Sequence, residues 1–228
     1  YAMRETEGGV VVSGYLNSQN RNTEDVWIIK VNLEGELIWD RTLQSNSRQR
    51  CWAMVSAPDE GFVLTGYESV QNGLDMILLK INDDGNLLWS RSYNIDFRYH
   101  YIRGLEKTRE GDYLIAGYVG DQGLKLPFML KTNSRGVMRW SRVYDLRDDL
   151  GIAPDRNGFY SVIIGEDNSM IAAGQVNNSP NFTGQDALIV KIGGEIQEPS
   201  FVAWSPEDTV FTTVLGDTVN FWVHVGDQ

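Results

Sequence analysis

The sequence predicts an all-β protein built from four units of about fifty residues each. Three signals recur at this step. An apolar run ends in a lysine, at Lys30, Lys80, Lys131 and Lys191. A turn phrase follows the first three runs and has Asn three residues before Gly and Trp four residues after it, as at Asn82, Gly85 and Trp89. A glycine precedes each run, at Gly14, Gly66, Gly117 and Gly174.

The apolar runs are predicted to be strands covered on both faces. Residues 26–31 and 76–81 are almost continuously apolar instead of alternating, which is typical of a strand between two packed sheets. The phrase after each run suits a type I turn, because the Asn side chain can bond the turn backbone and Gly accepts a positive φ. The sequence therefore predicts a hairpin whose second strand carries the Trp.

Two further strands are expected ahead of each apolar run. The recurring glycine closes one of them, and a turn rich in acidic residues and Gly stands before that strand. In the second unit the four strands are predicted at residues 52–57, 62–67, 76–81 and 87–92. Four antiparallel strands per period of about fifty residues are typical of a β-propeller blade. We predict about four blades, at about 1–46, 47–97, 98–150 and 151–193.

The repeat resembles the blades of bacterial secreted β-propellers. The resemblance is carried by Gly66-Tyr67, by Asp75 five residues before Lys80, and by the Asn82, Gly85 and Trp89 phrase. It covers residues 1–193 and implies a propeller in a large exported or surface protein, but no particular activity. The Gly-to-Trp step is also similar to the tryptophan-docking motif of quinoprotein-like propellers, which place the Asp one residue further from the Gly.

Both ends of the repeat are predicted to be incomplete. Residues 1–3 align with residues 52–54, so the first unit is expected to begin within its first strand. After Lys191 the chain reads Ile192-Gly193-Gly194 without the Asn turn or the Trp, so the last strand of the fourth unit is expected to be absent. We expect residues 1–193 to be a partial arc of a larger ring whose missing blades come from the same polypeptide; the alternative is a complete four-bladed ring.

A second module is expected after the repeats. Residues 194–199 are predicted to be a linker, and residues 200–228 carry strand patterns. The phrase Trp204-Ser205-Pro206 resembles the opening of an immunoglobulin-like bacterial module. A β-sandwich of that type needs about a hundred residues, so a truncated immunoglobulin-like domain with only the first strands is expected here.

Composition excludes several classes of partner and cofactor. A net charge of −11 argues against nucleic acid and anionic membrane surfaces, because both bind proteins with an excess of Lys and Arg. Cys51 is the only cysteine, so no intrachain disulfide can form. No apolar run approaches the ~20 residues of a membrane span, so no membrane insertion is expected. No cofactor is expected, since residues 155–158 alone offer fewer oxygens than the about six to eight that Ca²⁺ takes.

Most of the repeated residues are interpreted as scaffold. Trp39, Trp89 and Trp140 are expected to fill the core between blades instead of forming a platform for sugars. The arginines two residues after each Trp are expected at the surface or in ion pairs. The recurring aspartates are expected to cap turns, because they are too dispersed for one metal site; they are Asp25, Asp75 and Asp186.

The candidate ligand-binding residues lie in loops that do not repeat. Function on a propeller sits in the loops of one face, here those joining the second and third strands and those joining successive units. The second set mixes cations, aromatics and carboxylates, which suits a glycan or a protein ligand; as solvated connectors, these loops would carry no function. The candidates are Arg50, Trp52, Asp96, Arg98, Tyr99, His100, Tyr101, Asp148 and Asp149.

Three functions follow from these patterns. The preferred one is a non-catalytic binding or adhesion scaffold, extracellular or at the cell surface. The second is a propeller-type glycosidase or lyase with Asp96, Asp148 and Asp149 as its carboxylates, although acid spacing selects no glycosidase pair and only His100 and His224 are available to a triad. The third is a purely structural spacer.

Overall fold

The computed structural model describes residues 2–18, 23–121, 123–146, 156–176, 186–193, 200–205 and 208–213. Its elements are β-strands in antiparallel sheets, so the all-β prediction is confirmed. Asp148 and Asp149, and most of the module predicted at 200–228, lie outside the described residues. Within the described ranges, no helix is long and apolar enough to cross a membrane.

The strands fall into four consecutive groups. The first group is β1 (Ala2–Thr6), β2 (Gly9–Ser18), β3 (Thr23–Val31) and β4 (Leu37–Leu43). The second is β5 (Gln49–Ser56), β6 (Phe62–Val70), β7 (Gly73–Ile81) and β8 (Leu87–Tyr93). The third is β9 (Tyr99–Lys107), β10 (Tyr113–Gly120), β11 (Leu126–Thr132) and β12 (Met138–Val143). The last is β13 (Gly158–Ile164), β14 (Met170–Val176), β15 (Asp186–Ile192), β16 (Ser200–Ser205) and β17 (Asp208–Thr213).

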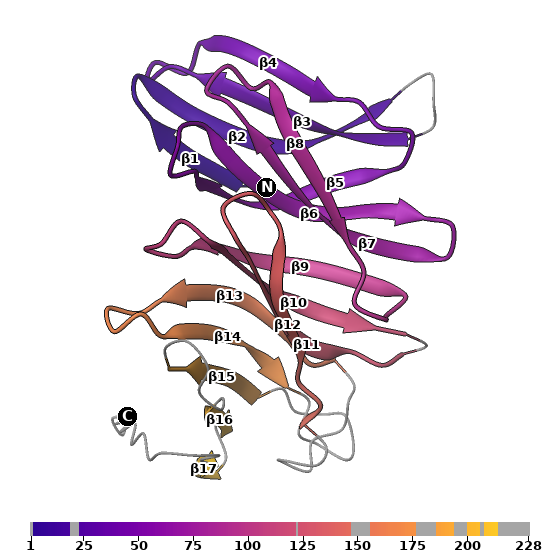
Figure 1. Ribbon diagram of the computed structural model, residues 1–228, viewed down its shortest axis with the longest axis vertical. Helices are drawn as coiled ribbons and strands as arrows, with labels where there is room; N and C mark the ends of the chain where they lie inside the picture. The colour runs from indigo at the N-terminus through magenta and orange to yellow at the C-terminus, as the bar shows by residue number, and fades with distance from the viewer. Residues whose placement is uncertain are drawn as a thin grey trace.

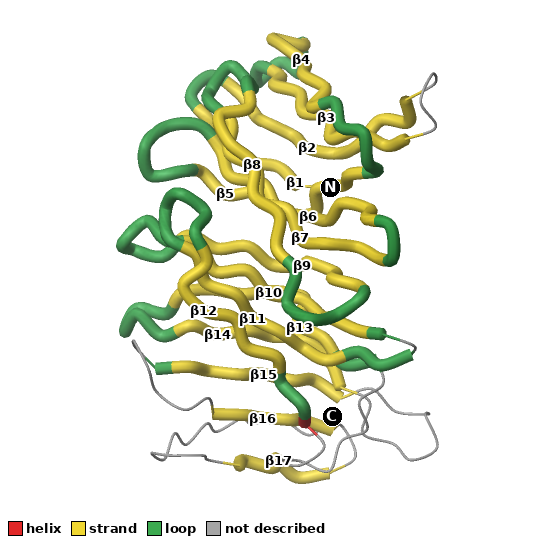
Figure 2. Tube along the Cα trace, turned by 45° about the vertical axis from the view of Figure 1, so that its right-hand side comes forward, coloured by secondary structure: helices red, strands yellow, loops and turns green. Residues whose placement is uncertain are grey.

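Each group is an antiparallel meander in which successive strands are hydrogen-bonded neighbours. One parallel pairing, between Leu74 of β7 and Tyr99 of β9, joins the second and third groups into an eight-stranded sheet. The groups follow one another along the long axis of the molecule (Figures 1 and 2). The first strand of each group contacts the first three strands of the group before it, so β5 lies against β1 to β3, β9 against β5 to β7, and β13 against β9 to β11.

Alternate side chains of β7, the third strand of the second group, pack against the two neighbouring groups. Ile77, Leu79 and Ile81 of β7 pack in one core cluster with residues of β2 and β3. Met76 and Leu78 pack in another cluster with residues of β9 to β11. This arrangement explains why residues 76–81 are apolar without alternation, as predicted.

One face of β3 in the first group is less covered by described residues than the matching face of β7 in the second group. Trp27, Ile29 and Val31 of β3 stand at the positions of Ile77, Leu79 and Ile81 in the repeat. The three β7 side chains are 2%, 2% and 0% exposed, whereas their counterparts on β3 are only half-buried. The same apolar pattern therefore serves an interface in the second group and an open face in the first.

A β-bulge explains the recurring glycine. In β5, β9 and β13 the pairing with the next strand skips one residue, which is Trp52, Arg103 and Tyr160 respectively. A Cβ on the glycine opposite would overlap the carbonyl oxygen of the bulged strand, that of Arg50 for Gly66 and that of Tyr101 for Gly117. Only a residue without a side chain fits there.

The turn phrase links each unit to the one before it. Gly85 and Gly136 have φ of 79° and 73°, and a Cβ on them would lie 2.7 Å from the Trp39 ring and 2.9 Å from the Trp89 ring respectively. The Trp of one unit therefore packs on the turn of the next. Trp39, Trp89 and Trp140 each pack against a core cluster between groups, as predicted for inter-unit core residues.

The recurring lysines and aspartates tie strands to turns. Lys80 is 2% exposed and bonds Asp59 Oδ1 at 2.5 Å, in the turn between the first two strands of its unit. Lys191 pairs with Asp167 in the same way, at 2.9 Å. The carboxylate of Asp25 accepts a hydrogen bond from the Ser45 backbone N–H at 3.0 Å, so it caps the loop after β4 and not the loop before the third strand, where capping was expected.

The fourth group differs from its prediction. Its last strand was expected to be absent after Lys191, but β16 pairs antiparallel with β15 from Ala187–Trp204 to Lys191–Ser200. The backbone of residues 200–205 therefore takes the place that β4, β8 and β12 have in their groups. This pairing was not predictable from the repeat because β16 lacks the Asn turn that precedes the other three last strands.

Candidate functional site

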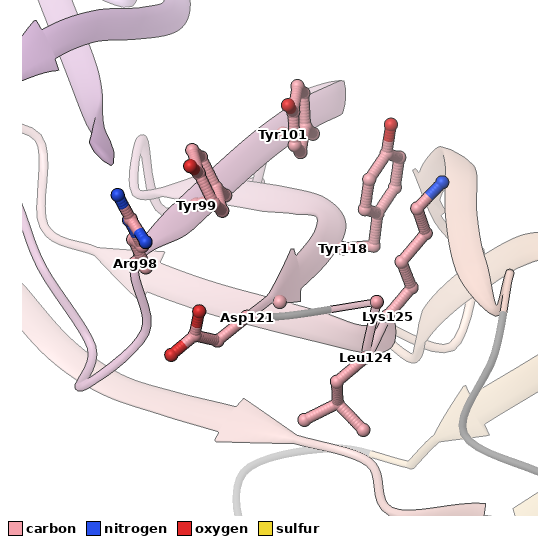
Figure 3. Close-up of a pocket in the computed structure, with 9 residues that line it drawn as sticks. Arg98, Tyr99, Tyr101, Tyr118, Asp121, Leu124 and Lys125 are labelled. Atoms are coloured by element: carbon pink, nitrogen blue, oxygen red, sulfur yellow. The ribbon is translucent and has the colours of Figure 1, made fainter. Parts of the chain in front are cut away.

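A cavity of about 260 Å³ opens where β9 begins and the β10–β11 hairpin turns. Its lining combines three tyrosines, two cations, one carboxylate and small loop residues (Figure 3). The lining residues are Arg98, Tyr99, Tyr101, Tyr118, Gly120, Asp121, Gly123, Leu124 and Lys125. The cavity thus lies on the face where the sequence placed ligand-binding loops: the connection between units and the loop between second and third strands.

The tyrosines form a row along one side of the cavity. The rings of Tyr101 and Tyr118 are stacked with centroids 4.8 Å apart, and Tyr99 stacks on Tyr101 at 6.5 Å. Tyr67 meets Tyr101 edge-on at 6.4 Å. Alternation along β9 puts Tyr99 and Tyr101 on the same face, and the antiparallel register places Tyr118 opposite Tyr101. Burial, and next the neighbouring Tyr118, raise the pKa of Tyr101, so its hydroxyl stays protonated and can donate a hydrogen bond.

A cation lies at each end of the row. The Arg98 guanidinium is 5.3 Å from the centre of the Tyr99 ring, and its Nε donates to the Asn72 carbonyl at 2.6 Å. The Lys125 ammonium is 5.5 Å from the centre of the Tyr118 ring. Figure 3 shows both side chains beside the tyrosines, with Asp121 below the row. The cavity is therefore bordered by aromatic faces, by the hydrogen-bond donors of Arg98 and Lys125, and by the carboxylate of Asp121.

Of the nine sequence candidates, Arg98, Tyr99 and Tyr101 line the cavity. Arg50 is held by Glu24, with Nη2 to Oε1 at 2.6 Å, and its guanidinium lies 4.2 Å from the centre of the Tyr15 ring. Trp52 is half-buried, and the Arg103 guanidinium lies 5.0 Å from its ring centre. Asp96 is an exposed loop residue with φ of 62° and does not line the cavity.

The prediction that His100 is a ligand contact is wrong, because its side chain is fully buried. Its Nδ1 lies 2.7 Å from the Leu74 carbonyl, and its Nε2 accepts the Ile95 backbone N–H at 3.2 Å. The ring is therefore a neutral imidazole that ties β9 to the start of β7 and to the connection between β8 and β9. On a strand that alternates, His100 points opposite to Tyr99 and Tyr101.

His100 should make the stability of the protein fall in mild acid. Burial lowers the pKa of this imidazole, so below about pH 6.5 the unfolded chain binds a proton that the folded chain does not. Stability is then lost at up to about 1.4 kcal/mol per pH unit until the folded-state pKa is reached. Denaturant unfolding between about pH 7.5 and 5.5 should show a shallower loss for His100→Gln than for the wild type. Equal slopes in the two proteins would contradict this assignment.

Sequence reasoning missed Tyr118, Lys125 and Asp121 in the cavity. Tyr118 belongs to the recurring Gly-Tyr pair and was therefore interpreted as scaffold. The signal that was present is the stop of this pattern in the fourth unit, where Gln175 follows Gly174. The glycine is present in all four units and the tyrosine in only three, which indicates that packing constrains the tyrosine less than the glycine.

Metal and thiol chemistry find no support in the described part of the chain. Among those residues, no group of three or more His, Cys, Asp or Glu side chains lies close enough to hold a metal ion. Cys51 is fully buried, and burial raises the pKa of its thiol to about 12, so it acts as a small apolar side chain.

No protein-family model matches the chain, and the curated proteins contain no sequence similar to it.

Proposed function

We propose that this chain is part of an extracellular β-propeller and that its loop face binds carbohydrate without catalysis. The observation that carries the proposal is the row of Tyr99, Tyr101 and Tyr118 between Arg98 and Lys125. Sugar rings have apolar faces that suit aromatic side chains, and their hydroxyl groups suit the surrounding donors and acceptors.

Three features support the propeller. Four-stranded meanders repeat along the chain, the first strand of each contacts the preceding one, and the turn glycines receive the Trp of the preceding unit. The half-exposed face of β3 supports a partial arc of a larger ring, because its apolar positions match those that other units bury. The resemblance of the repeat to exported propellers supports an extracellular or cell-surface location.

The arrangement favours sugar over peptide and nucleic acid. An extended peptide would be expected to add a strand to an open sheet edge; the bulges of β5 and β13 interrupt two such edges, and the cavity is lined mainly by side chains. Stacked aromatics with arginine also suit single-stranded nucleic acid. The net charge of −11 argues against nucleic acid as the ligand, because binding depends on attraction between positively charged side chains and the phosphates.

A glycan array followed by calorimetric titration tests the proposal. We expect wild-type protein to bind at least one oligosaccharide class and Tyr118→Ala to weaken that binding about tenfold or more, which corresponds to ~1.4 kcal/mol. Leu88→Ala is the matched control, since Leu88 is exposed on β8 and does not line the cavity. Absence of glycan binding, or binding only to a peptide library, would refute the proposed function.

A further inference from the structure

The first strand of three consecutive units carries one extra side chain at the same place. The β-bulges fall at Trp52 of β5, Arg103 of β9 and Tyr160 of β13, the residues that the strand registers skip. A bulge adds a residue to one strand and re-aims its side chain, and bulges are frequent beside functional sites. The repeat thus presents a Trp, an Arg and a Tyr at equivalent positions of neighbouring units.

These three side chains connect with the tyrosine row of the cavity. The Arg103 guanidinium lies 5.0 Å from the centre of the Trp52 ring. Burial raises the pKa of Tyr160, the nearby Tyr118 adds to that increase and the positive charge of Arg103 opposes it. The Tyr118 ring also lies over the start of β13, because a Cβ on Gly158 would be 2.8 Å from Tyr118 Cδ1.

Side chains of three units therefore lie close to one another. Arg103 lies over the Trp52 ring, Tyr101 stacks on Tyr118, and the Tyr118 ring lies beside the start of β13, the strand that carries Tyr160. Trp52, Tyr101 and Tyr118 are half-buried, and Tyr160 is 44% exposed, so the aromatic groups remain accessible. Packed sheets lie about 10 Å apart, so three units span about 20 Å.

We propose that the carbohydrate is a linear oligosaccharide that crosses three units, with Trp52, Arg103 and Tyr160 as its contacts outside the cavity. The inference rests on the proposed function and adds the shape of the ligand. The cavity of about 260 Å³ is smaller than the roughly 300–1,000 Å³ of pockets that enclose a small ligand. A single sugar would use only the Tyr101–Tyr118 stack, whereas an extended chain also reaches the side chains that the bulges present.

The test is the dependence of affinity on ligand length. Two ladders serve as probes, β-linked glucose oligomers and galacturonate oligomers, each from the disaccharide to the hexasaccharide. In the ladder that binds, we expect the hexasaccharide to bind at least about tenfold more tightly than the disaccharide. Trp52→Ala and Tyr160→Ala should each reduce this hexasaccharide-to-disaccharide ratio by roughly three- to tenfold, the range expected for one aromatic contact.

Two controls separate the possible failures. Tyr101→Ala should weaken binding of every member of the ladder, while Leu88→Ala should leave the whole length dependence in place. Affinity that does not rise with length, or a ratio that Trp52→Ala and Tyr160→Ala leave unchanged, would refute the linear ligand while the proposed function stands. Failure of both ladders together with an array without glycan binding would overturn both. Melting temperatures of all variants show whether a loss reflects unfolding.

Discussion

Gly117→Ala should destabilise the protein by at least about 3 kcal/mol, whereas Gly14→Ala should change its stability by less than about 1 kcal/mol. Both glycines hold the same place in the repeat, and neither has a positive φ. A Cβ on Gly117 would overlap the Tyr101 carbonyl oxygen and lie 3.0 Å from the Phe128 ring. A Cβ on Gly14 would meet no atom within 4 Å in the described part of the chain.

Denaturant unfolding of the two variants measures this difference. Gly117 lies against the bulged strand β9 and the Phe128 ring, whereas the described β1–β2 register stops at Ser13, beside Gly14, so the comparison measures the cost of this crowding. A Gly117→Ala protein as stable as Gly14→Ala would show that β9 does not bulge toward β10. If Gly117→Ala does not fold at all while Gly14→Ala does, the prediction is met in its extreme form.

Gly85→Ala should cost about 1–3 kcal/mol more than Gly35→Ala. Both residues have a positive φ, 79° and 85°, so each substitution carries the same backbone penalty of about 1–2 kcal/mol. The difference lies in what surrounds them. A Cβ on Gly85 would lie 2.7 Å from the Trp39 ring and 2.8 Å from Arg41 Cγ, whereas on Gly35 no described atom comes within 4 Å.

A double-mutant cycle identifies the Trp as the cause. In a Trp39→Ala background the ring is absent while Arg41 remains, so Gly85→Ala should lose part of its excess penalty over Gly35→Ala. The free energies of unfolding of the four proteins give the coupling. Additive effects of the two substitutions would mean that Trp39 does not pack on the turn of the second unit. That result would contradict the proposed contact between successive units.

Regular repetition made most of the fold predictable. The spacing of Lys80, Trp89 and Gly85 indicated a four-stranded unit, and β5 to β8 match the predicted strands with somewhat wider bounds. The interpretation of the Trp residues as packing between units is confirmed because each one meets a core cluster. A strand was predicted where β16 lies, but as part of a second module; its pairing with β15 was not predicted because it lacks the Asn turn that precedes the other last strands.

The candidate site was only partly predictable, for two physical reasons. The recurring glycine marks the strand opposite each β-bulge but not the bulged residue, so the alignment of Trp52, Arg103 and Tyr160 emerges only from the pairing registers. Alternation along β9 separates His100 from Tyr99 and Tyr101, yet all three looked alike as loop residues. Tyr118 was hidden by belonging to a repeated marker, although its ring is central to the stack.

The most direct test of the carbohydrate site is a crystal structure of the chain with the tightest-binding oligosaccharide of the titration series. We expect sugar rings on Tyr101 and Tyr118, between Arg98 and Lys125. A ligand bound elsewhere on the molecule, with the tyrosine row unoccupied, would contradict it.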